Sequence, residues 1–156
     1  MHIRLIAVSD RQPRWVDEAF DEYVKRFPGQ WRFRLQAVAA ARRTGDDNAM
    51  RAVKAEGVKI LKQLKPSETV VLLDETGMEF TSEGLARQLK NWQAAGSDLV
   101  FIIGGPDGVS DQCARRADLR WSLSRLTLPH GLARVMLAEQ LYRACTLLQG
   151  HPYHRG

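Results

Sequence analysis

The sequence predicts a single α/β domain with a largely parallel sheet flanked by helices. Apolar segments with strand character alternate with segments of helical periodicity along the whole chain. Several of these strands are apolar on both faces, as in parallel sheets that helices cover on either side. The chain has 156 residues, 44% of them hydrophobic, which is enough for one buried core. Because the chain lacks internal repeats and linkers, residues 1–156 are interpreted as one domain.

The first half of the chain contains three predicted strands and two predicted helices. Residues 3–8 and 69–74 are apolar strands, and residues 31–39 alternate apolar and polar side chains, which is typical of a strand. A helix is expected between Pro13 and the Pro28-Gly29 pair. A second helix should follow the polar loop 41–48 and reach about Lys65.

The second half of the chain repeats this alternation. Residues 75–80 (ETGMEF) predict a turn, after which Thr81 or Ser82 should cap a helix that ends near Gly96. Residues 99–103 (LVFII) form a fully apolar strand. A short helix, a strand-like segment at 120–126 and a long helix at 130–148 complete the predicted elements.

Three segments leave the carboxyl ends of predicted strands, where open α/β sheets bind their ligands. They begin at Leu73, Gly104 and Leu123. The GGPDG segment would let a ligand approach the backbone closely, although a structural tight turn uses the same residues. The leucines of LSRLTLPHG could enclose a flat apolar ring, or the segment could simply connect a strand to a helix. The G-x-G-x-x-G and P-loop patterns are absent, which argues against the usual dinucleotide site and against a P-loop.

Positive charge is concentrated toward the C-terminus. Residues 109–156 contain seven arginines and no lysine against three acidic residues, together with three of the four histidines. Arginine suits the bidentate recognition of phosphate, although an ordinary basic surface would have the same composition.

The long helix at 130–148 is apolar nearly all round. Glu139 and Arg143 are spaced to form an i,i+4 pair on its polar strip. Arg134 lies on the opposite, apolar side, where an unpaired charge would be costly, so it needs a partner. A helix that is apolar on both sides needs cover from more than its own sheet, and a homodimer interface would supply it.

The chain ends in HPYHR, for which the residues alone allow three interpretations. His151 and His154 could join Cys145 and His130 in a zinc site, although the usual ligand spacings are missing. The segment could be a disordered end. It could also be an active-site element, because imidazole and phenol transfer protons and arginine binds phosphate. Cys–His hydrolase chemistry is a remote further alternative, since Cys145 falls within an apolar helix.

The location of the protein can also be predicted from the sequence. The chain shows no signal peptide and no apolar run of about 20 residues that would span a membrane. Cys113 and Cys145 form no disulfide framework, which favours a reduced, cytoplasmic setting.

Taken together, LLDETG, FIIGGPDGVS, LSRLTLPHGLARVMLAEQLYRA and the terminal HPYHR resemble the ribosomal RNA large subunit methyltransferase H family. The match covers essentially the whole chain. These are small SPOUT-class enzymes that methylate N3 of a pseudouridine in 23S rRNA within the assembled 70S ribosome. The resemblance implies a SPOUT-type α/β fold with a C-terminal trefoil knot, S-adenosylmethionine (SAM) as cofactor, no metal and an obligate homodimer.

The resemblance, together with the chemistry of methyl transfer, gives expectations for individual residues. Cofactor contacts are expected at the three strand ends: Leu73, Gly104, Gly105, Gly108, Leu123, Ser124, Arg125, Leu126, Thr127 and Leu128. Catalytic roles are expected for His130, Arg143, Tyr153 and His154, and substrate binding for Arg134 and Arg155. Met78 and Arg125 depart from the residues common in many relatives. Two alternatives remain at this point: a non-catalytic ribosome-binding module and a nucleotide hydrolase that uses GGPDG for phosphate.

Overall fold

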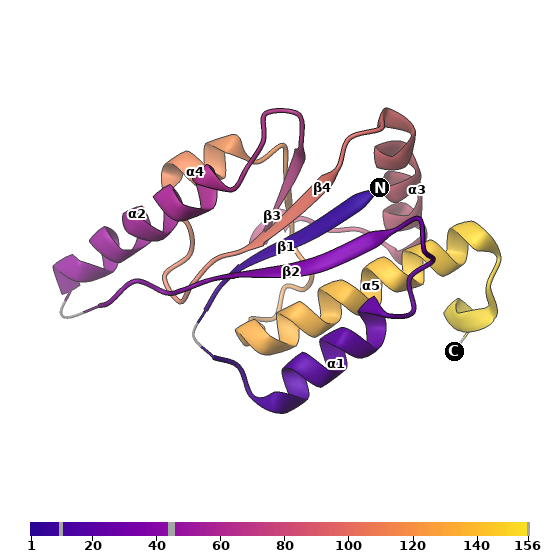
Figure 1. The fold of residues 1–156 in the computed structure, drawn as a ribbon, viewed down its shortest axis with the longest axis horizontal. Coiled ribbons are helices and arrows are strands. Elements are labelled where there is room, and N and C mark those ends of the chain that lie inside the picture. Colours follow the sequence, from indigo (N-terminus) through magenta and orange to yellow (C-terminus); the bar gives the residue numbers. More distant parts are fainter. Residues whose placement is uncertain (10, 44–45, 156) are drawn as a thin grey trace.

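The central element of the structure is a parallel β-sheet, seen in a computed structural model that describes residues 1–9, 11–43 and 46–155. The described residues form five strands in the order β2-β1-β4-β3-β5, all parallel (Figure 1). The strands are β1 (His2–Val8), β2 (Arg32–Val38), β3 (Thr69–Met78), β4 (Leu99–Ile103) and β5 (Leu119–Trp121). The predicted α/β class is therefore confirmed.

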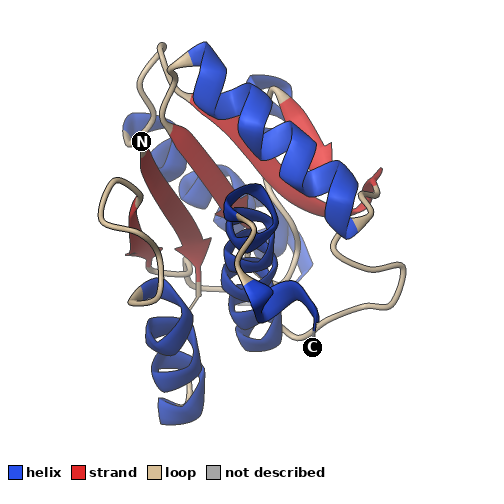
Figure 2. Cartoon of the chain, turned by 90° about the vertical axis from the view of Figure 1, so that its right-hand side faces the viewer, coloured by secondary structure: helices blue, strands red, loops and turns tan. Residues whose placement is uncertain are grey.

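Helices cover both faces of this sheet (Figures 1 and 2). One layer contains α1 (Arg14–Val24), α3 (Ser82–Ala95) and α5 (His130–Gln149), and the other contains α2 (Asp46–Lys62) and α4 (Asp111–Arg116). Each layer has its own hydrophobic core, the first centred on residues such as Phe101 and the second on residues such as Ile102. A 3₁₀ turn, η1 (Pro152–Arg155), follows α5. Within the described part of the chain, no helix is both long and apolar enough to cross a membrane.

Strand β4 lies in the middle of the sheet and is buried along its whole length. It pairs with β1 on one side, from Ile3 opposite Leu99, and with β3 on the other, from Thr69 opposite Leu99. Successive side chains enter opposite cores because strand residues alternate faces. This arrangement explains why LVFII is apolar throughout. The pairing of β4 with β1 and with β3 ends at the same edge of the sheet, at Ile103 and Ile102.

The predicted turn at 75–80 is wrong, because β3 continues to Met78. The Asp74 carboxylate accepts hydrogen bonds from the Thr76 backbone N–H (2.9 Å) and hydroxyl (2.8 Å), which makes an irregularity in the strand. Pairing with β5 then resumes at Met78, opposite Trp121. A Cβ on Gly77 would lie 2.7 Å from the Arg120 carbonyl, so this glycine is needed for the close approach of the two strands.

The strand-like segment expected at 120–126 is also shorter than predicted, since β5 ends at Trp121. The Ser122 hydroxyl donates a hydrogen bond to the Ser124 carbonyl (2.9 Å), and residues 122–128 then follow an irregular path.

The boundaries of the other helices and strands differ less from the predicted ones. Thr81 caps α3 and Gly96 ends it with a φ of 76°, as expected, while α1 and α2 end about three residues early. Part of the predicted loop 41–48 is the start of α2, and residues 44–45 lie outside the described residues. The trefoil knot stays a prediction.

Gly57 lets α2 pack closely against the N-terminus of α4. A Cβ at Gly57 would lie 2.3 Å from the Ser110 hydroxyl oxygen and 2.9 Å from its Cβ. The same hydroxyl accepts a hydrogen bond from the Cys113 N–H at 3.3 Å and caps α4. This contact fixes α2 against the segment that leaves β4.

We therefore predict that Gly57→Ala destabilises the protein by about 1–2 kcal/mol, because the overlap with Ser110 outweighs the higher helix propensity of alanine. The measurement is the free energy of unfolding in urea. In a Ser110→Gly background, which removes the overlapping atoms while keeping an acceptable cap, the same change should become stabilising. Destabilisation of equal size in both backgrounds would contradict this explanation.

Candidate cofactor cavity and C-terminal tail

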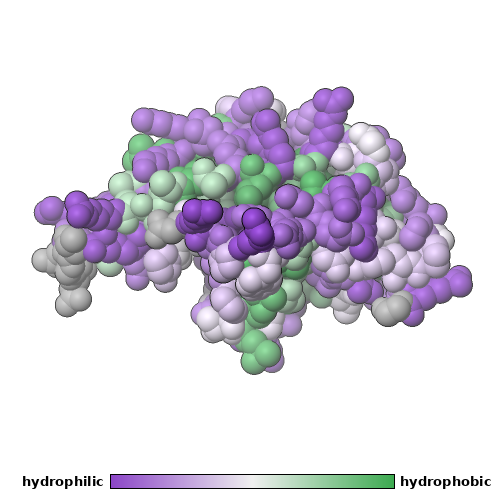
Figure 3. Space-filling model, turned by 60° about the horizontal axis from the view of Figure 1, so that its bottom comes forward, coloured by the Kyte–Doolittle hydropathy of each residue, from purple (hydrophilic) through white to green (hydrophobic). Residues whose placement is uncertain are grey.

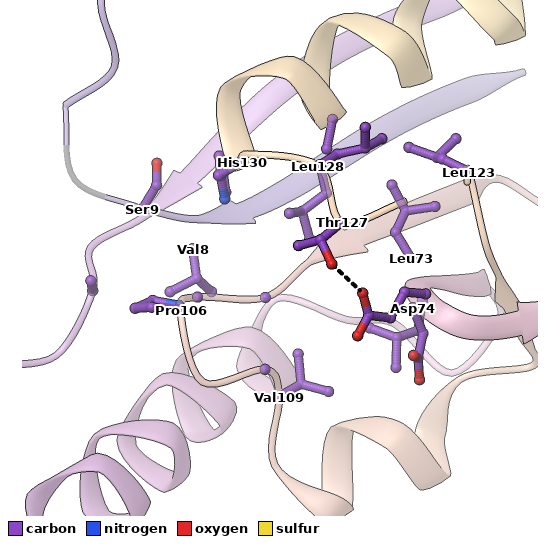
Figure 4. Close-up of a pocket in the computed structure, with 18 of the residues that line it drawn as sticks. Val8, Ser9, Leu73, Asp74, Pro106, Val109, Leu123, Thr127, Leu128 and His130 are labelled. Carbon is purple, nitrogen blue, oxygen red and sulfur yellow. Dashed lines mark hydrogen bonds between the residues drawn. The ribbon is translucent and has the colours of Figure 1, made fainter. Parts of the chain in front are cut away.

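A cavity of about 1220 Å³ opens at the carboxyl ends of the strands. It lies where the strand order reverses, between β1 and β4, which is the position at which parallel α/β sheets bind ligands. Figure 4 shows side chains from several strands and the segments after them turned toward this space, including Val8 at the end of β1, Leu73 on β3, and Val109 after β4. The cavity is larger than the roughly 300–1000 Å³ typical of small-molecule sites, so it has room for more than one ligand group.

The glycine loop after β4 forms one wall of the cavity. The Gly108 N–H donates a hydrogen bond to the Gly105 carbonyl at 3.0 Å, and Gly108 adopts a φ of +81°, which glycine tolerates without strain. A Cβ on Gly104 would lie 2.9 Å from the carbonyl carbon of Gly108, so the loop closes on itself only with glycine there. A Cβ on Gly105 would instead point toward Glu56 and Val8, at 3.2 and 3.3 Å.

The loop 122–128 forms the opposite wall. The Ser124 hydroxyl accepts a hydrogen bond from the Leu126 N–H at 2.9 Å, which holds the loop in its irregular shape. Nine of the ten residues predicted to contact a cofactor line the cavity: Leu73, Gly104, Gly105, Gly108, Leu123, Ser124, Leu126, Thr127 and Leu128. The exception is Arg125, whose side chain is 88% exposed and pairs with Glu79 at 3.0 Å.

Charged residues that the sequence analysis had not assigned also line the cavity. Asp74 and Glu75 contribute carboxylates on the β3 side, where Glu75 accepts a hydrogen bond from the Thr127 hydroxyl at 3.2 Å (Figure 4). Arg42 and Arg43 contribute guanidinium groups from the segment after β2. The DETG motif could have indicated Asp74 and Glu75, because it directly continues a predicted strand. The arginines fell in a polar loop whose position in space depends on the strand order.

His130 and Arg134 form a linked pair at the start of α5. The Arg134 guanidinium is 3% exposed and donates hydrogen bonds to His130 Nε2 (3.1 Å) and to the Ser9 hydroxyl (2.6 Å). The predicted need of Arg134 for a partner is thus confirmed. Burial, and then the charge of Arg134, lowers the pKa of His130 from 6.5 to about 4. His130 is neutral at physiological pH and its Nε2 lone pair is already used, so in this arrangement it does not accept a proton.

The C-terminal tail packs against the last turns of α5. The predicted Glu139–Arg143 pair is present, with two hydrogen bonds of 3.0 and 2.7 Å, and Arg143 lies over the Tyr153 ring. The Tyr153 hydroxyl donates a hydrogen bond to Glu139 at 3.1 Å. Burial, followed by the hydrogen bond with Tyr23, raises the pKa of Tyr153, so this phenol keeps its proton. The tail is therefore an ordered element up to Arg155, not a frayed end.

His154 differs from its neighbours in the tail. Its Nδ1 atom is buried yet has no hydrogen-bond partner among the described residues. Buried polar atoms are almost always paired, so this unpaired nitrogen is unusual.

The cavity and the tail lie at opposite ends of α5. The cavity borders on His130, the first residue of this 20-residue helix, whereas the tail packs from the last residue back to Glu139, so about 13 Å of helix still lie between them. In Figure 1 the C-terminus lies near the last turns of α5, away from the start of that helix. One metal ion cannot reach both His130 and His151, which excludes the zinc interpretation. Burial raises the pKa of Cys145 to about 12, which excludes a thiolate nucleophile there.

Comparisons with known proteins agree with this architecture. A family model described as "Predicted SPOUT methyltransferase" matches residues 1–154. Proteins named ribosomal RNA large subunit methyltransferase H from Thioalkalivibrio sulfidiphilus and Hahella chejuensis are each 46% identical over 155 residues, which covers 99% of this chain and 99% of each relative. The protein of that name from Chromobacterium violaceum is 45% identical with the same coverage.

The depressed pKa of His130 predicts a specific acid response. Above pH 6.5 the imidazole is neutral in the folded and the unfolded protein. Between pH 6.5 and 4 the unfolded chain binds the proton more readily, so the stability of the fold decreases as the pH is lowered through this range. NMR titration of the His130 ring should give a midpoint near 4. Arg134→Met should raise that midpoint, because it removes the neighbouring charge, but burial should keep it below the usual value. A midpoint near 6.5 in the unaltered protein would contradict the hydrogen-bonded arrangement.

Proposed function

Since the chain belongs to the SPOUT methyltransferase family, we propose that it transfers a methyl group from SAM to N3 of a pseudouridine in 23S rRNA. Its full-length relatives carry the name ribosomal RNA large subunit methyltransferase H, which supports rRNA as the substrate. The family leaves no reason to favour a non-catalytic module or a nucleotide hydrolase. A ribosomal substrate puts the enzyme in the cytoplasm.

The observation that carries this proposal is the convergence of three strand ends on one cavity. The leucines of loop 122–128 and Leu73 offer apolar walls for a flat adenine ring, and the glycine loop lets a ligand approach the backbone closely. Asp74 and Glu75 offer carboxylates to hydroxyl or amino groups of the same ligand. These residues fit SAM, which supplies an electrophilic methyl group on its sulfonium when bound.

The protein must also deprotonate the nucleoside. N3–H of pseudouridine lies between two carbonyl groups, so it is a weak acid that loses its proton around the time of attack. Among the predicted catalytic residues, His130 and Tyr153 are committed to hydrogen bonds with Arg134 and Glu139. We assign proton acceptance to His154, which is half-buried in the tail and is not committed to either of these bonds. Arg143 is suited to stabilise negative charge on a base carbonyl.

The separation of the cavity from the tail implies that two chains share each site. Helix α5 holds the tail contact at Glu139 about 13 Å along the helix from His130, so we propose that each tail acts on the cavity of a partner. Large hydrophobic residues are exposed along α1 and α5, among them Trp15 at 54%, Leu132 at 37% and Leu148 at 37%. Figure 3 shows hydrophobic patches interrupting the hydrophilic surface on the side of the molecule that lies at the bottom of Figure 1. A homodimer through this side would cover them.

The assembled ribosome is the proposed form of the substrate. The arginine excess of residues 109–156, which includes Arg155 in the exposed tail, is suited to phosphate contacts. Arg134 is buried and hydrogen-bonded to His130 and Ser9, so we now assign it to holding the cavity wall instead of binding RNA directly.

The first test combines calorimetry with methyl transfer. The protein should bind SAM, and it should transfer labelled methyl groups to 23S rRNA in 70S ribosomes taken from cells that lack the gene. Nuclease mapping and mass spectrometry should place the label on N3 of one pseudouridine. Deleting residues 152–156 should abolish transfer and leave SAM binding intact. Full activity of the truncated protein would remove the tail from the mechanism.

A second test asks whether the tail acts on the partner. Leu128→Glu places a charge in the apolar cavity wall, and His154→Ala removes the proposed proton acceptor, so each variant alone should be inactive. Coexpressed, they form mixed dimers in which one of the two sites combines an intact cavity with an intact tail, and about a quarter of normal activity should return. If the mixture stays inactive while mixed dimers are present, each chain uses its own tail.

A further inference from the structure

Arg43 joins three segments beside the cavity through charged hydrogen bonds. Its NH1 and NH2 groups pair with the two oxygens of Glu56 on α2, at 2.8 and 3.0 Å. Its Nε donates to Asp107 of the glycine loop at 2.7 Å. NH1 also donates to the Ala41 carbonyl at 3.0 Å. We name Arg43, Glu56 and Asp107 the arginine clasp.

Burial makes Glu56 dependent on this partner. Its side chain is 2% exposed, and one of its oxygens also accepts the Ala41 N–H at 2.8 Å. A buried carboxylate is tolerable only when it is paired and hydrogen-bonded, so Glu56 holds Arg43 firmly in place. The hydrogen bonds to Glu56 and then to Asp107 raise the pKa of Arg43, in accord with its charged state.

Asp107 is the freer end of the clasp, with 45% of its side chain exposed. It lies in the turn that the Gly108 N–H and the Gly105 carbonyl close at 3.0 Å. Unlike Arg43, it is not among the residues that line the cavity. Any effect of Asp107 on a ligand in the cavity must therefore pass through Arg43 or through the shape of the glycine loop.

We propose that Arg43 is a positioning residue for the methyl-donor site, fixing the glycine loop against the segment after β2 through Asp107. The guanidinium fork holds two carboxylates at once, which the single ammonium group of lysine does not. The clasp thus connects the buried charge of α2 to the loop whose backbone faces the donor. The proposal rests on the proposed function, because its ligand is SAM.

The experiment compares three single variants of the full-length dimer. Arg43→Lys should keep the pair with Glu56 and lose the bond to Asp107. Asp107→Asn keeps a residue that favours turns and removes only the charge. Glu22→Gln is the matched control, because Glu22 also accepts an arginine hydrogen bond, at 2.9 Å, and is 44% exposed, but lies on α1. Arg43→Met would leave Glu56 buried without a partner and is avoided because it endangers folding.

We expect Arg43→Lys and Asp107→Asn each to weaken SAM binding about threefold to fivefold by calorimetry, in line with a partly exposed pair. The double variant should bind no more weakly than either single variant, since both remove the same interaction. Amide exchange of residues 104–108 should accelerate in the ligand-free variants, and Glu22→Gln should change neither quantity. Unchanged affinity in Asp107→Asn, or losses that add in the double variant, would overturn the proposal.

The same measurements separate this proposal from the proposed function. If the unaltered protein binds no SAM, the proposed function fails, and the inference about donor positioning fails with it. If the unaltered protein binds SAM and the variants bind equally well with unchanged amide exchange, only the clasp fails. Weaker binding in Arg43→Lys with normal binding in Asp107→Asn would mean that Arg43 touches the donor directly, which also rejects a positioning role.

Discussion

The burial of β4 on both faces constrains the rest of the molecule. A parallel strand in the middle of the sheet leaves no solvent-exposed side, so the chain reaches open space only where that strand ends. At this point the backbone folds back on itself between Gly104 and Gly108. The pairing of β1 and of β3 with β4 ends at the same edge, where Val8, Leu73 and Gly104 line one cavity. The position of the cavity is thus a consequence of the core.

Helix α5 imposes the second constraint, because it is part of the core and also keeps the cavity and the C-terminal tail apart. Its N-terminus borders the cavity through His130, and its C-terminus carries the tail through Gly150, which ends the helix with a φ of 68°. A well-packed helix of this length does not bend enough to bring its two ends together. A site that needs both ends must therefore draw on two copies of the chain, as we propose.

The parts of the structure that depend on local pattern were predictable, and those that depend on pairing in space were not. LVFII predicted β4 with the right bounds, and the i,i+4 spacing predicted the Glu139–Arg143 pair. The extension of β3 to Met78 was missed because the turn residues of DETG form an irregularity within the strand. The strand predicted at 120–126 ended at Trp121, because Ser122 and Ser124 turn the backbone away. The bonds of Arg43 to Glu56 and Asp107 join residues 13 and 64 positions apart, and no sequence periodicity signals such contacts.

The pairing of β1 with β4 has a consequence for how the chain is made. β1 is synthesised long before β4, its neighbour on one side, which ends only at Ile103. Until then its β4-facing edge is open and its apolar residues, such as Ile3 and Leu5, have no complete core to enter. An exposed apolar strand edge is prone to pairing with other chains. During synthesis, β1 can therefore pair with β2 alone until β4 is complete at Ile103.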